Sequence, residues 1–325
     1  MSNRVNPLIQ SRVSLAPMAG ITDFVLRNLV RKFAPTALLT TEMISSEYLA
    51  QTLNGRSGGE ILKRGKNHSP ISYQISGHKP HLMYQAAKFL DNYADMIDIN
   101  MGCPVKKVVG GQDGAALMRN PSLASELVQA VKDGCSKPVS VKFRLGYTVD
   151  EMNFVEFGQK MQDAGAEFIT IHGRTRSQMY SGHADWAKIK LLKENIDIPV
   201  FANGDICSIE DAIECLEKSG ADGIAIGRGA MGDATLIGRV AHYLNTGEKL
   251  PKPTLTERIE ILKSHLDGEI ELRGEKVAIK FMRKFYPYYL SGFENAKILR
   301  SKLVVEEDYN KIISLLEELC IFKIK

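Results

Sequence analysis

The sequence predicts an α/β protein, a (β/α)8 TIM barrel followed by a small C-terminal all-helical domain. Three observations lead to this fold class. Eight short apolar runs alternate with helix-like segments over about the first 230 of 325 residues, which is the order of elements in a parallel α/β barrel. A polar residue follows nearly every run, as expected where barrel strands deliver side chains to one mouth. After about residue 246 only helical patterns follow.

The eight apolar runs have the length of strands, and several are bounded by Gly, Pro, Asn or Asp, which is typical of buried strands in α/β proteins. The runs are residues 13–16, 37–41, 71–75, 96–99, 139–143, 168–171, 200–202 and 223–226. A doubly wound sheet is the structural alternative, because it also alternates strands and helices. The number of units and the polar strand ends favour the barrel.

Helical periodicity between the runs is clearest at residues 123–131 and 209–216. Ser208 precedes the second segment and is typical of an N-cap, with Asp211 three residues later in place of the usual Glu of a capping box. We therefore expect a helix that begins just after Ser208.

Two domains are expected, a catalytic barrel at residues 1–246 and a helical domain at 247–325. Pro251 and Pro253 mark the linker between them. One helical stripe in the second domain is expected to face its core, since its members recur at i, i+3, i+4 and i+7. The stripe consists of Ala278, Phe281, Met282 and Phe285.

A second face of the same segment is basic. It carries Lys276, Lys280, Arg283 and Lys284. A solvated helix face and a phosphate-contacting helix both explain such a pattern, and the sequence leaves the two interpretations open.

Composition sets only broad limits on function. The net charge of +4 permits a nucleic-acid partner without arguing for one. The five cysteines form no Cys-x-x-Cys pair and no zinc spacing, so we expect free thiols, no metal site and a reducing compartment. The first residues lack a secretory apolar core and no run is long enough to span a membrane. We expect a cytoplasmic protein, with a monomer as the default.

Cys103 lies in a loop that begins where the run at 96–99 gives way to Asn, Gly, Cys and Pro. Gly102 allows the backbone to turn and Pro104 stops strand pairing, which presents the thiol at the tip of the loop. A thiol placed there suits an acid or a nucleophile, whereas an isolated cysteine is more often a small packing residue. The glycine-rich residues 110–114 continue a polar loop.

Side chains at or just beyond the predicted strand ends are expected to converge on one mouth. They are Met18, Glu42, Gln74, Asn100, Lys142, His172, Asn203 and Arg228. Lys142 falls inside a strand, where a cation is costly to bury without an anion. A ligand contact, a structural ion pair with Glu42 or Asp98, and a Schiff-base lysine all remain open for it.

Glycine-rich loops follow the last two predicted strands, at residues 203–205 and 227–229. Barrels commonly bind phosphate at this position, through backbone N–H groups and an Arg fork. Gln74 offers both a donor and an acceptor to a pyrimidine-like edge. His172 opens a basic loop suited to phosphate, while Tyr180 and Trp186 are expected to pack at the barrel rim.

Six stretches, in one order along the chain, resemble the motifs of the flavin-dependent tRNA-dihydrouridine synthase family of bacterial type. They are residues 15–23 (LAPMAGITD), 100–108 (NMGCPVKKV), 139–146 (VSVKFRLG), 172–182 (HGRTRSQMYSG), 203–205 (NGD) and 226–228 (IGR). One such motif is weak evidence, but six in sequence over most of residues 13–240 are highly specific.

The resemblance implies FMN in the barrel mouth, NADPH as its reductant, and a uridine flipped out of folded tRNA to stack on the reduced ring. The C5–C6 double bond of that uridine would be reduced to dihydrouridine, with Cys103 as proton donor to C5. The residues implied in cofactor binding are Pro17, Met18, Ala19, Gln74, Lys142, His172, Asn203, Gly204, Asp205, Gly227 and Arg228. Those implied in RNA contact are Asn100, Arg144, Arg174 and Arg176, with the helical domain as a second wall.

Two other functions compete with this interpretation. An FMN-dependent barrel reductase acting on a small molecule would explain the barrel but not the appended basic helix. An RNA-binding factor with a vestigial barrel would explain the helix but requires neither flavin nor Cys103.

Overall fold

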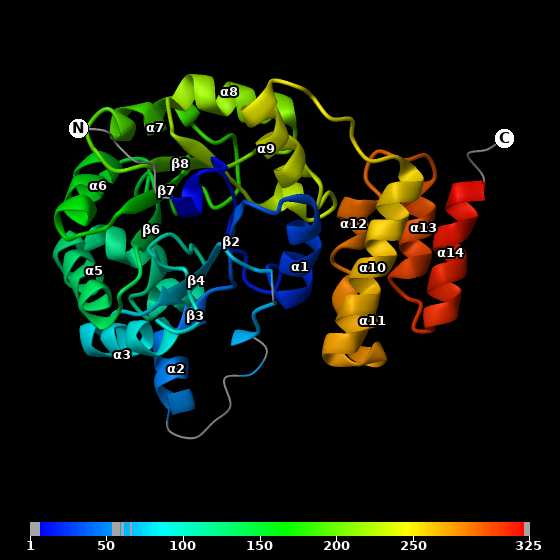
Figure 1. Ribbon diagram of the computed structural model, residues 1–325, viewed down its shortest axis with the longest axis horizontal. Coiled ribbons are helices and arrows are strands. Elements are labelled where there is room, and N and C mark those ends of the chain that lie inside the picture. The colour runs from blue at the N-terminus through cyan, green and yellow to red at the C-terminus, as the bar shows by residue number, and fades with distance from the viewer. Residues whose placement is uncertain (1–6, 54–58, 60–61, 66, 322–325) are drawn as a thin grey trace.

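The structure is a computed structural model that describes residues 7–53, 59, 62–65 and 67–321. Figure 1 shows strands ringed by helices on one side and a separate group of helices on the other, joined by an extended segment after α9. The predicted barrel and the predicted helical C-terminal region are both confirmed.

The strands form one parallel sheet in the order β2-β1-β9-β8-β7-β6-β5-β4-β3, and pairing of β2 with β4 closes it into a barrel. They are β1 (Val13–Leu15), β2 (Leu38–Thr40), β3 (Ile44–Ser45), β4 (Ile71–Ser76), β5 (Met96–Asn100), β6 (Val139–Arg144), β7 (Phe168–His172), β8 (Val200–Asn203) and β9 (Gly223–Ile226). Each predicted run overlaps one strand. The short β3 follows β2 and pairs with the end of β4, so the two together fill one position of an eight-position barrel.

Helices cover the outside of the barrel. They are α1 (Phe24–Phe33), α2 (Ser46–Leu53), α3 (Pro80–Leu90), α4 (Lys106–Gly110), α5 (Pro121–Gly134), α6 (Phe154–Asp163), α7 (Trp186–Lys193), α8 (Ile209–Ser219) and α9 (Leu236–Thr246), with 3-10 turns η1 (Pro7–Ile9), η3 (Gly114–Arg119) and η4 (Arg228–Ala230). The helices expected at 123–131 and 209–216 are α5 and α8. The Ser208 hydroxyl accepts a hydrogen bond from the Asp211 amide at 2.9 Å, which confirms the expected N-cap.

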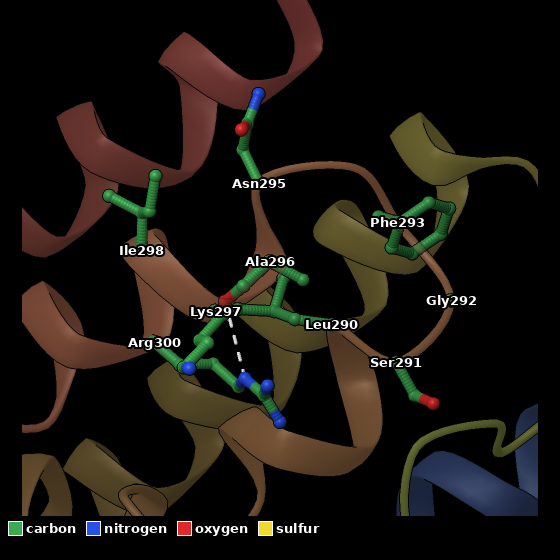
Figure 2. A pocket seen from close by; sticks show the side chains of 9 residues that line it. All are labelled: Leu290, Ser291, Gly292, Phe293, Asn295, Ala296, Lys297, Ile298 and Arg300. Carbon is green, nitrogen blue, oxygen red and sulfur yellow. Dashed lines mark hydrogen bonds between the residues drawn. The ribbon is translucent and has the colours of Figure 1, made fainter.

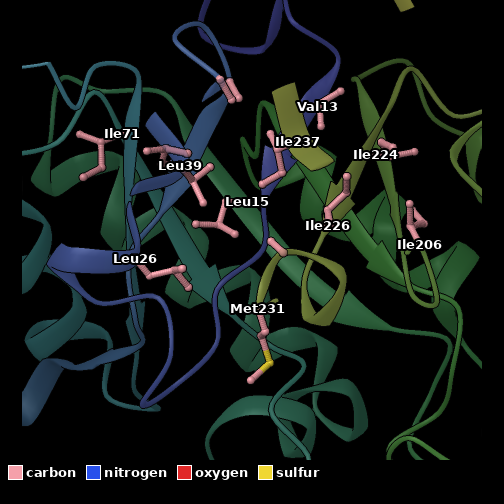
Figure 3. Close-up of a cluster of buried hydrophobic side chains, with 14 of the residues drawn as sticks. Val13, Leu15, Leu26, Leu39, Ile71, Ile206, Ile224, Ile226, Met231 and Ile237 are labelled. Atoms are coloured by element: carbon pink, nitrogen blue, oxygen red, sulfur yellow. The ribbon is translucent and has the colours of Figure 1, made fainter. Parts of the chain in front are cut away.

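Side chains alternate strictly between the two faces of each strand. Outward-facing residues are apolar and pack against the helices, and Figure 3 shows part of this core. Labelled there are Leu15, Leu39, Ile71, Ile224 and Ile226 of the strands, together with Leu26 of α1 and Ile237 of α9. Inside the barrel a smaller apolar cluster, Ile9, Leu38, Met96, Phe168 and Phe201, fills one end. The same inward-facing rows become polar toward the carboxyl ends of the strands.

Strand register aligns those polar residues. Asn100 lies opposite Lys142, Arg144 opposite His172, and His172 opposite Asn203. Since these strands are parallel and adjacent, their inward side chains form one continuous layer at the mouth of the barrel.

The helical region contains α10 (Leu255–Arg273), α11 (Glu275–Met282), α12 (Tyr286–Tyr289), α13 (Ala296–Leu303) and α14 (Tyr309–Ile321). Helix α10 packs against α1 of the barrel. Gly268 permits the close approach, because a Cβ there would lie 2.6 Å from Cγ1 of Val25. At the same contact Arg273 donates to Asp23 at 2.7 Å and to Glu269 at 2.6 Å.

The burial expected of the stripe is confirmed, since Ala278, Met282 and Phe285 are buried and Phe281 is partly buried, but α11 ends at Met282 and Phe285 is the N-cap of α12. Three cations of the predicted basic face are not free. Both Lys280 and Arg283 lie within 3.5 Å of Glu307. Lys284 donates to the carbonyl of Gly20 in the barrel. These three cations therefore have partners within the protein.

Among the described residues, none of the helices combines the length and the apolar character needed to cross a membrane. In the same part of the chain, no three His, Cys, Asp or Glu side chains are grouped so that they could hold a metal ion.

Asp23 ties α1 to α10, and its substitution should weaken the contact between the barrel and the helical region. Its carboxylate accepts from the Leu26 amide as the N-cap of α1 and from Arg273. We expect Asp23→Ala to lower the free energy of unfolding by about 4 kcal/mol, about 1 from the cap and about 3 from the buried ion pair. Asp23→Asn keeps the cap oxygen and should lose only the ion-pair part. Chemical denaturation of both variants measures this, and an unchanged Asn variant would contradict the ion-pair role.

Candidate active site

A cavity of about 510 Å³ opens at the carboxyl ends of the barrel strands. Fourteen of the residues singled out from the sequence line it: Pro17, Met18, Ala19, Gln74, Asn100, Cys103, Lys142, Arg144, His172, Asn203, Gly204, Asp205, Gly227 and Arg228. Glu42 does not line it, and instead accepts from the Gly20 amide at 2.5 Å behind the β1–α1 loop. The expected convergence on one mouth is thus observed for all but one of the strand-end residues.

A chain of hydrogen bonds crosses the floor of the cavity around Asp98. Its two carboxylate oxygens accept from the Ser140 hydroxyl and the Gln74 amide nitrogen, both at 2.6 Å. The Gln74 oxygen accepts from the Asn100 amide nitrogen at 2.8 Å. Burial raises the pKa of Asp98, while the bonds from Ser140 and Gln74 oppose that rise. The chain fixes which atom of each amide is oxygen, so Gln74 and Asn100 each retain one free N–H donor.

The same network fixes the loop that carries Cys103. The Asn100 side-chain oxygen accepts from the Cys103 amide at 2.9 Å, and the Cys103 carbonyl accepts from the Ala115 amide at 3.1 Å. Gly114 has a φ of +60°, and a Cβ there would lie 2.9 Å from the Cys103 carbonyl. The backbone of Cys103 is therefore held on both sides, with its partly exposed thiol at the cavity.

Lys142 is half-buried in the cavity and, within the described residues, makes no hydrogen bond or ion pair. Burial and, to a smaller extent, the nearby Arg144 lower its pKa from 10.5 to about 8, against opposing effects of Asp98 and Cys103. The structural ion pair with Glu42 or Asp98 is not formed. An ammonium group without an anion beside it is suited to an anionic ligand.

His172, Arg174, Asp205 and Arg228 form a second linked group, which begins on the strand next to that of Lys142. Arg174 donates to Nε2 of His172 at 3.3 Å and to Asp205 at 2.6 Å, and Arg228 reaches Asp205 at 3.2 Å. Because a guanidinium only donates, the proton of the neutral imidazole lies on Nδ1. Burial and the surrounding cations Arg144, Lys142, Arg174 and Arg228 keep the pKa of His172 well below its usual value.

Asp205 remains an anion in this group. Burial would raise its pKa, but bonds from Arg174 and the Ala184 amide outweigh that effect and lower it. Gly204 has a φ of +122°, and a Cβ there would lie 2.9 Å from the His172 ring. A side chain at this position is therefore excluded by both backbone and space.

Three arginines expected to contact RNA occupy different environments. Arg174 is only 1% exposed, and it donates to His172 and Asp205. Arg144 lines the cavity but is 3% exposed, and it joins two loops by donating to the carbonyls of Gly102, Thr175 and Met179. Arg176 lies outside the cavity, 5.1 Å from the Tyr147 ring.

Tyr180 and Tyr288 line the cavity but were not predicted as site residues. Tyr180 was expected to pack at the rim, yet it is 52% exposed, with Arg228 at 4.7 Å and Arg144 at 5.8 Å from its ring. Trp186 does pack at the rim, donating to the Gly204 carbonyl at 3.0 Å. Tyr288 belongs to α12, so a search based on the ends of barrel strands does not find it. The only signal in the sequence is the group of tyrosines at residues 286–289.

A second, more open depression of about 480 Å³ lies wholly in the helical domain, between α12 and the first turns of α13 (Figure 2). Within it Arg300 donates to the Ala296 carbonyl at 3.2 Å. It shares no lining residue with the barrel cavity, so it is a separate feature of the surface.

A closed parallel barrel with polar groups converging at the carboxyl ends of its strands is the architecture of a barrel enzyme. The family model described as "Dihydrouridine synthase (Dus)" matches residues 14–322. The chain therefore belongs to the dihydrouridine synthase family and is an oxidoreductase.

Curated relatives agree with this assignment. The "Probable tRNA-dihydrouridine synthase 1" of Synechocystis sp. is 41% identical over 296 residues, covering 91% of this chain and 82% of its own. The "tRNA-dihydrouridine synthase B" of Shewanella oneidensis is 39% identical over 283 residues, covering 87% of each chain. Among solved structures, an old yellow enzyme homologue from Zymomonas mobilis aligns over 76% of this chain and 92% of its own, with a TM-score of 0.47 and 12% identity. That likeness is too distant to bear on function.

We predict that the Lys142 amine titrates near pH 8. Pulse acylation across a pH series, read by peptide mass spectrometry with exposed Lys106 as a reference for reagent reactivity, measures the midpoint. Asp98→Asn should lower it further, because the Asp98 carboxylate favours the ammonium form. A midpoint close to the ordinary lysine value of 10.5 would show that Lys142 is neither desolvated nor beside Arg144 as the structure has it.

Proposed function

We propose that this protein reduces the C5–C6 double bond of specific uridines in tRNA to dihydrouridine, using FMN that is reduced by NADPH, with Cys103 as the proton donor. Family membership and the names of the relatives support the reaction. The observation that carries the residue assignment is the Cys103 thiol, fixed by its backbone in the same cavity as the unpaired Lys142 ammonium.

The cavity's donor set fits FMN. Lys142 offers a cation with no anion beside it, Gln74 retains an N–H donor, and Arg228 offers a half-exposed guanidinium. Gln74 and Lys142 would hold the ring, while His172, Asn203–Asp205 and Gly227-Arg228 would hold the tail and phosphate, against Pro17-Met18-Ala19. Reduced FMN would supply a hydride to C6 of uracil.

The chain's own residues would complete the addition at C5. The Cys103 thiol would give its proton to C5 as the C5–C6 π bond opens, leaving a thiolate. Lys142 and Arg144 both lie close enough to Cys103 to interact with its charge, so they would stabilise that thiolate. Because Cys103 is partly exposed, solvent can return the proton.

For RNA, the structure favours the rim of the cavity over the basic face of α11. Tyr180 and Arg228 are exposed there and in contact with each other, and an aromatic ring beside a guanidinium suits a flipped or flanking base. Asn100 would hold the uracil edge with its free N–H. The buried Arg174 would act only through His172 and Asp205.

The alternative is an FMN-dependent barrel reductase of a small molecule. One observation favours it, since three of the four cations of the predicted basic face, Lys280, Arg283 and Lys284, are engaged with Glu307 and Gly20. Nucleoside mass spectrometry on unmodified tRNA incubated with protein, FMN and NADPH separates the two. A gain of two hydrogens on uridine supports the synthase, and NADPH oxidation that depends only on small enones supports the alternative.

We expect Cys103→Ala to lower dihydrouridine formation on the order of 10²–10⁴-fold, as for loss of a positioned acid. Binding of FMN and RNA should be retained, because the backbone bonds that shape the loop do not involve the thiol. Cys207 offers a matched control, because this residue also lines the cavity. Cys207→Ala should stay within about threefold of the parent. Near-normal turnover by Cys103→Ala would refute its role as the acid.

A further inference from the structure

The helical domain takes part in the wall of the barrel cavity. Among the described residues that line it, Tyr288 is the one that lies beyond residue 246. Its neighbours Tyr286 and Tyr289 are 0% and 1% exposed, whereas Tyr288 is 38% exposed. The flanking tyrosines form the core of the domain, and Tyr288 is turned out of it.

The backbone of Tyr288 is held on one side by the barrel and on the other by α10. Gly232, between η4 and α9, has no room for a side chain, since a Cβ there would lie 2.4 Å from the Tyr288 carbonyl carbon. The Tyr288 carbonyl accepts from Arg258 of α10 at 3.1 Å. Gly232 and Arg258 thus set where the Tyr288 side chain meets the cavity, and that position depends on how the two domains are docked.

The Tyr288 side chain has no structural task of its own. Within the described part of the chain its hydroxyl makes no hydrogen bond, whereas the hydroxyl of Tyr289 lies 3.0 Å from Nδ1 of His265. An exposed phenol ring at the mouth of a cavity offers an aromatic face and an unused donor. Nucleobases stack on such faces with little dependence on sequence.

We infer that Tyr288 is a substrate-contact residue that packs against a nucleobase of the RNA next to the uridine being reduced. This inference rests on the proposed function. It makes the helical domain part of the active site, so productive binding requires RNA and both domains together. The Tyr180 and Arg228 pair would form another part of the rim of the same cavity.

The test compares steady-state reduction of an unmodified tRNA transcript by Tyr288→Ala, Tyr288→Phe and Tyr84→Ala. Tyr84 of α3 is a matched control, because it is also 38% exposed and does not line the cavity. Tyr288→Ala should lower kcat/KM for tRNA about 10- to 100-fold, the range that loss of one base–aromatic stack produces. Tyr288→Phe and Tyr84→Ala should stay within about threefold of the parent.

A second measurement separates an RNA contact from a cofactor contact. Reduction of bound FMN by NADPH, followed without RNA by stopped-flow absorbance, should change less than about twofold in Tyr288→Ala. An equal loss in this half-reaction would overturn the inference and assign Tyr288 to the cofactor or nicotinamide. An unchanged kcat/KM for tRNA would overturn it as well. If the parent protein forms no dihydrouridine at all, the proposed function itself fails.

A fluorescent base analogue gives a readout that does not depend on turnover. Once the reduced uridine is mapped, 2-aminopurine placed beside it should be quenched on binding the parent protein and Tyr288→Phe. Tyr288→Ala should bind the same RNA with less quenching. Equal quenching by all three proteins would contradict stacking on Tyr288.

Discussion

The buried carboxylate of Asp98 is the constraint around which the cavity is organised. A carboxylate in a barrel interior is costly unless both oxygens accept hydrogen bonds, and here Ser140 and Gln74 supply them. These bonds fix the orientation of the Gln74 amide, and its oxygen accepts from Asn100. The Asn100 amide is therefore oriented so that its oxygen accepts from the backbone N–H of Cys103. One desolvated anion therefore determines the orientation of three side chains on three strands and of the loop that carries the thiol.

The second constraint is the docking of the helical domain on the β1–α1 segment. Gly20 donates to Glu42 with its amide and accepts from Lys284 with its carbonyl. The residues just before Gly20 form part of the cavity wall, so the helical domain supports that wall from behind. Gly232 and Tyr288 form another contact between the barrel and the helical region. The contacts that hold the helical region against the barrel therefore also position residues of the cavity wall.

The barrel could be predicted because its strands must present apolar residues to the helices, and such strands are visible in the sequence as short apolar runs. The sequence predicted most of the cavity because parallel strands end at one face. It could not predict that Arg174 would be buried, since its partners His172 and Asp205 are brought together only by the fold. Tyr288 was missed for a related reason: it reaches the cavity from another domain, and no local pattern encodes domain docking. The engagement of Lys280 with Glu307 likewise depends on helices distant in sequence.

The electrostatics of the cavity explain why the fold tolerates Lys142. Lowering its pKa from 10.5 to about 8 corresponds to a destabilisation of about 3 kcal/mol in the charged state. Because the unfolded chain binds the proton more tightly, this cost is fully present below about pH 8 and fades as the pH rises toward 10.5. A residue kept only for stability would have an anion beside it, yet the available carboxylate, Asp98, is already saturated by neutral donors. An anionic ligand beside Lys142 would stabilise the ammonium form and offset this cost. Part of the folding free energy lost in the free protein would then appear as binding free energy for that ligand.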